Sequence, residues 1–171
     1  MNPEHMQSLL TLIRRHRQAT LAVVDADAGE PVTARVSYVE EPDCAAVLIH
    51  LSNLSAHKRI LQRNPMCSLL ICEPDPGVGD VLSLARVALQ ATASQLARGG
   101  EEYAQAKARF LEKLPSAEIM FALPDFDLFR VQPRRARFIA GFGRAFEVAD
   151  WSDVLSPPGS RSSSPHRPPG E

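Results

Sequence analysis

The segment Leu48–Pro65, LIHLSNLSAHKRILQRNP, contains the residues whose types and spacing best suit chemistry. An apolar run stops at Ser52, and a short basic helix is predicted over residues 55–63. The first turn of a helix presents unpaired N–H groups and a partial positive charge. Hydroxyl and cationic side chains gather at this turn, namely Ser52, Ser55, His57, Lys58 and Arg59. We therefore predict an anion-binding site, for which the alternative is a Ser-capped helix with a solvated basic face.

Two predicted strands carry polar side chains on one face. Arg35 and Ser37 lie on the polar face of the strand predicted at 32–39, and Arg86 lies on that of the strand predicted at 81–93. A mixed face of this kind either lines a ligand groove or is simply wet. If this face lines a groove beside the predicted anion site, the ligand that fits both is a phosphorylated planar cofactor.

Strands joined mainly by hairpins, with a few inserted helices, must position these residues. Hydrophobic periodicity predicts strands at 19–25, 32–39, 45–51, 67–72, 81–93, 126–132 and 135–148, and helices at 4–17, 55–63, 101–114 and 116–123. A turn at Pro133 is expected to separate the last two strands. This order indicates a mainly β fold with added helices, built as an antiparallel barrel rather than a doubly wound sheet.

Composition divides the chain at about residue 150. The 171 residues suit one domain with a sizeable core, which we place at residues 1–150. Residues 151–171 are rich in Pro and Ser and cannot bury enough apolar surface to offset their ordering entropy. A disordered C-terminal tail is therefore predicted for this segment.

Charge and cysteine content exclude several classes of partner. The net charge of −1 provides no field that would favour nucleic acid or an anionic membrane, and no apolar run is long enough to span a bilayer. Cys44, Cys67 and Cys72 are an odd number without zinc-site spacing, so we expect no metal site and free thiols in a reducing cytoplasm.

Familiar catalytic and nucleotide-binding motifs are absent. The chain has no GxGxxG after a strand, no GxxxxGK[ST] and no GxSxG elbow, and its catalytic residues are unknown. His50 lies on an apolar strand and is expected to be a core histidine with satisfied hydrogen bonds. Any chemistry is therefore expected to be that of a bound cofactor.

Three stretches carry a resemblance to a known family. They are ARVSYV (34–39), LSNLSAHKRILQRNPMCSLLI (51–71) and LFRVQPRRARFIAGFGRAF (128–146). In order and spacing, residues 4–150 resemble the FMN-binding split β-barrel proteins related to pyridoxamine 5′-phosphate oxidase. The GFGRA ending is most similar to the branch linked to haem utilisation. The oxidase's own substrate-binding segment is not evident after Phe146, so oxidation of pyridoxamine 5′-phosphate is not expected.

The resemblance implies a set of cofactor-binding residues. The FMN phosphate would be held by Ser52, Ser55 and His57 with help from Lys58. The flavin ring would lie along Arg35, Val36 and Ser37, and Arg86 would reach the ribityl chain or the ring. The resemblance also implies a homodimer with FMN at the interface.

Three functions follow from the resemblance. The first is an FMN-dependent redox protein of unknown substrate, for which enzyme activity is uncertain. The alternative is a haem-binding or haem-degrading protein, in which His166 would bind the iron with support from Asp125 of the second copy. The third is a flavin-binding fold that has lost catalysis. The competing interpretation is that His166 is an exposed tail residue and Asp125 belongs to a turn.

Overall fold

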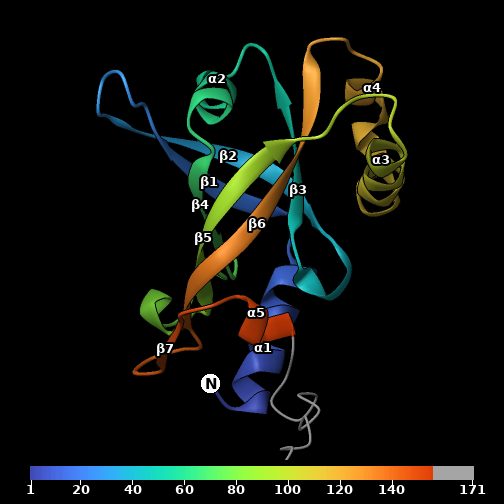
Figure 1. Cartoon of the computed structure of the whole chain (residues 1–171). Helices are drawn as coiled ribbons and strands as arrows, with labels where there is room; N and C mark the ends of the chain where they lie inside the picture. The colour runs from blue at the N-terminus through green and yellow to red at the C-terminus, as the bar shows by residue number, and fades with distance from the viewer. Residues whose placement is uncertain (156–171) are drawn as a thin grey trace, which may run out of the picture.

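The computed structural model describes residues 1–155, and these form a β-barrel with helices at its ends and on one side (Figure 1). The strands are β1 (Gln18–Val24), β2 (Pro31–Glu40), β3 (Val47–Ser52), β4 (Met66–Cys72), β5 (Arg86–Gln95), β6 (Phe126–Ile139) and β7 (Ala145–Val148). The α-helices are α1 (Pro3–Arg15), α2 (Ala56–Arg63), α3 (Glu101–Lys113), α4 (Glu118–Phe121) and α5 (Ser152–Leu155). Short 3-10 turns are η1 (Pro42–Cys44), η2 (Val81–Ser83) and η3 (Pro115–Ala117).

The strands follow the order β3-β2-β1-β4-β5-β6-β7, and β3 also pairs with β6, which closes the barrel. Every pairing is antiparallel. The ladder between β2 and β3 covers only Tyr38–Glu40, so the barrel is split beyond Tyr38. The predicted antiparallel split barrel is therefore confirmed.

Two hydrophobic cores hold the elements together. Inside the barrel, Leu21, Leu69 and Leu89 pack with residues of α1, and the Tyr38 hydroxyl donates to the Ile13 carbonyl at 2.7 Å. This bond ties α1 to the barrel. A second core lies between the opposite face of β2, β3 and β6 and the helices α3 and α4. It contains Val39, Leu48, Leu96, Ala106, Phe110, Leu114, Ala117, Phe121 and Leu128.

The predicted turn at Pro133 is wrong, because β6 continues through it. Gln90 and Ala91 of β5 pair with Arg135 and Pro133, so Arg134 is an extra residue in a β-bulge. A bulge accommodates Pro133, which has no N–H to donate to a ladder. The chain turns later, between β6 and β7.

Two further boundaries differ from the prediction. Residues 81–93 were expected to form one strand, but Val81–Ser83 form η2 and β5 begins at Arg86. Packing also continues past residue 150, since Trp151 is 3% exposed and its indole N–H donates to the Cys44 carbonyl at 3.0 Å. Most residues of the predicted disordered tail, 156–171, lie outside the described part of the chain.

No helix in residues 1–155 combines the length and the apolar character needed to cross a bilayer.

A buried lysine fixes the turn between β3 and α2. The Lys58 side chain is 0% exposed, and its ammonium lies 2.5 Å from Asp127 Oδ2. The ammonium also donates to Asn53 Oδ1 and, at 3.3 Å, to the Asp125 carbonyl. These three acceptors use all three of its N–H donors. The Asn53 backbone N–H donates to the same Asp125 carbonyl at 2.7 Å, so the turn is held against the start of β6.

We expect Asp127→Asn to lower the free energy of unfolding by about 3–5 kcal/mol, because it leaves the Lys58 charge buried without its counter-ion. Asp27→Asn is the matched control, since it breaks an ion pair with Arg63 in which both side chains are more than 70% exposed. That control is expected to cost less than about 1 kcal/mol. Urea unfolding of both variants measures the difference, and equal losses would contradict the assigned role of Lys58.

Candidate functional site

The turn from β3 into α2 uses part of its polar side chains for its own structure. The Ser52 hydroxyl donates to Asp125 Oδ2 at 2.9 Å and accepts the Leu54 N–H at 3.1 Å. Lys58 has no N–H left for an external anion. The predictions that Ser52 and Lys58 contact a phosphate therefore need correction, because both side chains bind the start of β6 instead.

Ser55 and His57 have side chains that remain available at this turn. Ser55 occupies the N-cap position of α2, but its hydroxyl makes no capping hydrogen bond. His57 is half-buried, and burial lowers the pKa of its imidazole below the usual value. A neutral imidazole still has one N–H to donate. The helix start thus offers two side-chain donors in addition to its backbone N–H groups.

Arg35 and Ser37 face outward on β2, whereas Val36 is 6% exposed and points into the barrel. The Arg35 guanidinium donates to Gln18 Oε1 on the neighbouring strand, a partner that the sequence did not reveal. Residues 31–37 pair with β1 only, so the other edge of this segment has no strand partner among residues 1–155. A ligand could reach backbone groups there, as the resemblance requires for residues 35–37.

Arg35 belongs to a row of outward-facing residues that crosses the sheet. Thr20 pairs with Arg35 and with Leu70, Leu70 pairs with Ala88, and Ala88 pairs with Arg137. We call this row, Arg35–Thr20–Leu70–Ala88–Arg137, the outer row. Its centre is small or apolar, and Leu70 is 40% exposed. The row is therefore a flat apolar strip with an arginine at each side.

A groove of about 610 Å³ lies over the Arg35 side of the outer row. Ligand pockets usually measure about 300–1,000 Å³. The groove is lined by Arg15, His16, Arg17, Gln18, Ala19, Thr20, Arg35, Leu70, Cys72, Glu73 and Pro74. Arg15, His16 and Arg17 at the end of α1 give the groove a basic side. We call it the outer groove.

Arg86 lies beside the outer groove. It pairs with Cys72, and its Nη1 donates to the Leu82 and Leu84 carbonyls at 3.2 Å each. Burial raises the pKa of the Cys72 thiol, although the positive charge of Arg86 opposes that shift. Cys72 is therefore a neutral thiol near neutral pH. Arg35 and Arg86 thus share one face of the sheet.

The predicted site residues form two groups within one chain. Arg35, Ser37 and Arg86 face the outer side of the sheet, whereas Ser55 and His57 lie on the turn before α2. Strand β4 starts after α2 and ends at Cys72, opposite Arg86, so its seven residues separate the two groups by about 20 Å. Figure 1 shows α2 and the start of β5 at opposite ends of the barrel.

His50 does not have the satisfied hydrogen bonds that were expected of it. Both ring nitrogens are buried, and neither has a hydrogen-bond partner in the described part of the chain. The ring stacks on Phe121 at a centroid distance of 3.9 Å and lies 5.1 Å from Phe126. Burial, and secondarily the charge of Arg98, lowers the pKa of His50 to about 4. His50 is therefore a neutral member of an aromatic cluster.

His166 lies outside the described residues. Asp125, predicted to support it, accepts the Ser52 hydroxyl and is half-buried in the turn just before β6. Within residues 1–155, no group of three or more His, Cys, Asp or Glu side chains is arranged to hold a metal ion.

Comparisons with known proteins agree with the fold and with the sequence motifs. The family model described as pyridoxamine 5′-phosphate oxidase matches residues 6–140. The heme oxygenase HutZ of Vibrio cholerae is 32% identical over 130 residues, which cover 75% of this chain and 72% of that protein.

Solved structures give the same result. A heme binding protein from Mycobacterium smegmatis has a TM-score of 0.79 and 25% identity, with 91% of this chain and 61% of that chain covered. The crystal structure of HutZ from Vibrio cholerae, described there as a heme storage protein, has a TM-score of 0.66 and 26% identity, with 85% and 96% covered.

The family model and the Vibrio cholerae relative each cover most of the chain. The chain therefore belongs to the pyridoxamine 5′-phosphate oxidase family and lies close to its haem-utilisation branch.

Proposed function

We propose that the chain binds haem and takes part in haem breakdown, rather than serving mainly as an FMN-dependent oxidoreductase. The names of its relatives support this, since one is a heme oxygenase and another a heme binding protein. The observation that carries the proposal is the outer groove, where Arg35 lies beside Thr20 and Leu70 of the outer row, and Arg86 lies next to the groove opposite Cys72.

The residues of the outer groove fit the chemistry of haem. Haem is a flat apolar macrocycle with two carboxylates at one edge, so it needs an apolar floor and cations beside it. Thr20 and Leu70 line the floor of the groove, and Ala88 extends the outer row beyond Leu70. Arg35 and Arg86 supply the cations, and each guanidinium has N–H donors beyond those already used. Bound haem would supply oxygen activation, while the protein would orient the ring and limit the access of water.

The outer groove also contains side chains that can bind haem iron. His16 and Cys72 both line it, and imidazole and thiolate are common axial ligands. Cys72 is the weaker candidate, because its thiol is protonated. The prediction that His166 binds the iron, supported by Asp125, remains part of this proposal.

FMN binding is the second candidate, and one observation favours it. Ser55 and His57 present unpaired donors at the start of α2, where backbone N–H groups also point outward. A phosphate could accept from all of them. The correction of Ser52 and Lys58 reduces the number of donors and makes this site weaker than the sequence indicated.

We also propose that two copies of the chain associate through the outer face of the sheet. Val24, Met66 and Leu70 are 48%, 45% and 40% exposed on β1 and β4. Exposed apolar side chains gathered on one face commonly mark an interface. A second copy would cover the outer groove and could bring its own α2 toward Arg35 and Arg86, which lie about 20 Å from α2 in one chain.

Haem binding can be measured by titrating the purified protein with haemin and following the Soret band. We expect saturable binding, with at least tenfold lower affinity in the double variant Arg35→Ala/Arg86→Ala, because each arginine contributes a charge-assisted bond of about 1.5–3 kcal/mol. Arg59→Ala/Arg63→Ala, on exposed positions of α2, is the control and should bind normally. No saturable Soret change in the wild type would refute haem binding, and equal affinity in both double variants would refute the location.

FMN binding has its own test. We expect Ser55→Ala/His57→Ala to lower FMN affinity at least tenfold, because two phosphate bonds of about 1.5–3 kcal/mol each are lost. Flavin fluorescence quenching measures the affinity, and Ser116→Ala, on the exposed turn η3, serves as the control. An unchanged affinity in the double variant would discard the phosphate assignment.

Association through the outer face predicts that Leu70→Glu converts a dimer to a monomer in analytical ultracentrifugation, because it places a charge in the apolar strip. Ile119→Glu is the control, since Ile119 is 73% exposed on α4, which packs against the opposite face of the sheet. A wild-type protein that sediments as a monomer, or a dimeric Leu70→Glu variant, would contradict the proposed interface.

A further inference from the structure

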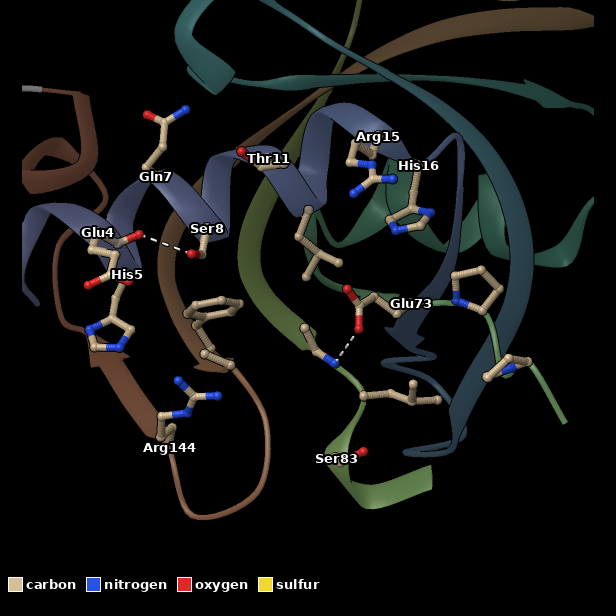
Figure 2. A pocket seen from close by; sticks show the side chains of 17 residues that line it. Glu4, His5, Gln7, Ser8, Thr11, Arg15, His16, Glu73, Ser83 and Arg144 are labelled. Carbon is tan, nitrogen blue, oxygen red and sulfur yellow. Dashed lines mark hydrogen bonds between the residues drawn. The ribbon is translucent and has the colours of Figure 1, made fainter. Parts of the chain in front are cut away.

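A second groove, of about 620 Å³, runs between α1, the loop after β4 and the hairpin that joins β6 to β7 (Figure 2). We call it the hairpin groove. Its floor is apolar, with Leu12, Leu84, Phe138 and Ala140. Figure 2 shows His5 and Arg144 toward one end and Arg15 and His16 toward the other. The second end is shared with the outer groove, so the two grooves are continuous there.

Most charges of the hairpin groove have a structural role. Glu73 Oε2 accepts the Ala85 N–H at 2.9 Å, and the Glu73 N–H donates to the Ala85 carbonyl at 2.9 Å, so this residue closes the loop. Glu4 lies in the first turn of α1 and Arg15 in the last, where their charges oppose the helix dipole. These three charges are therefore explained without a ligand.

Arg144 has no such explanation. Its guanidinium makes no hydrogen bond or ion pair with any residue of the described chain, although Glu4 lines the same groove. Its backbone closes the turn, since the Arg144 N–H donates to the Gly141 carbonyl at 3.2 Å. The side chain is exposed and lies at the groove without a partner in the described chain.

Gly141 allows the position of the Arg144 side chain. A Cβ at residue 141 would lie 3.3 Å from Arg144 Nη2 and 3.4 Å from the Ser83 carbonyl. Its φ of 124° is also a conformation that other residues rarely adopt. The GFGRA motif therefore places an unpaired guanidinium between the hairpin and η2.

Aromatic rings lie next to this guanidinium. The His5 and Phe146 rings are 4.2 Å apart between centroids, and the Phe138 and Phe146 rings stack at 6.3 Å. His5 and Phe138 line the hairpin groove directly. Phe138 is 1% exposed and Phe146 does not line the groove, so a flat ring would pack against His5 over the apolar floor.

We propose that the hairpin groove is a binding site for a small aromatic carboxylate. The carboxylate accepts two hydrogen bonds from the Arg144 guanidinium, whose planar fork matches its geometry. The ring lies over the apolar floor and packs against His5, whose own ring contacts Phe146. Glu4 lies at the same end of the groove as His5 and Arg144 and would repel a second negative charge there, so a monoanion is preferred. This site adjoins the one proposed for haem, because the two grooves meet at Arg15 and His16, but Arg144 lies toward the other end and lines only the hairpin groove.

Isothermal titration with 2-naphthoate, a rigid aromatic carboxylate, tests the proposal. We expect the full-length protein to bind it saturably at one site. The neutral analogue 2-naphthalenemethanol should bind at least tenfold more weakly, because it cannot form the charge-assisted pair. Absence of saturable binding of 2-naphthoate, or equal affinity for both compounds, would overturn the proposal.

Matched arginine variants locate the site. Arg144→Leu should weaken 2-naphthoate binding at least tenfold, and Arg144→Lys should restore part of the affinity because it keeps the charge. Arg135→Leu removes an exposed arginine of β6 that does not line the hairpin groove and should leave the affinity unchanged. Normal binding by Arg144→Leu, or an equal loss in Arg135→Leu, would contradict the assignment.

The Soret titration separates this proposal from haem binding. Arg144→Leu is expected to bind haemin like the wild type while losing 2-naphthoate. A protein that binds 2-naphthoate but not haemin would refute only the haem proposal.

Discussion

The buried ion pair between Lys58 and Asp127 is the constraint on which the arrangement of this molecule depends. An ammonium with no exposure needs a full set of acceptors, and Lys58 finds them on the turn itself and on the start of β6. These bonds join the end of β3 to the start of β6, and β3 pairs with β6 to close the barrel. The split between β2 and β3 lies at the other edge of β3. The turn before α2 cannot move without exposing the Lys58 ammonium or separating it from Asp127.

That constraint also changes where a ligand can bind. The two side chains that hold the turn, Ser52 and Lys58, were expected to hold a phosphate, and only Ser55 and His57 remain free to do so. A groove of about 610 Å³ with several basic side chains lies instead on the outer side of the sheet and at the end of α1. These positions suit haem, a flat ring with two carboxylates, on the outer side of the sheet better than a phosphorylated cofactor at the start of α2. The names of two relatives, a heme oxygenase and a heme binding protein, also favour the proposal that the ligand is haem.

The order of the elements could be predicted because each strand and helix shows its own period of apolar residues. The bulge at Pro133 could not, because a proline between two apolar runs fits a turn as well as a bulge, and only the register of β5 decides. The role of Lys58 could not be predicted either, because its partner is not local in the sequence. Its partner Asp127 is far away in the sequence, and a lysine among basic neighbours suggests a solvated face. Likewise, nothing local to His50 reveals that three phenylalanines from other elements surround its ring.

The most direct test of the account is where haem sits on the protein. Ferric haem is paramagnetic and broadens the amide signals of nearby residues, so a nitrogen-15 spectrum recorded during a haemin titration maps the site. The account predicts that the signals of Thr20, Arg35, Leu70 and Ala88 broaden first, while those of Phe110 and Phe121 in the second core persist. Broadening centred on α3 and α4, with the strip across β1, β4 and β5 unaffected, would contradict it.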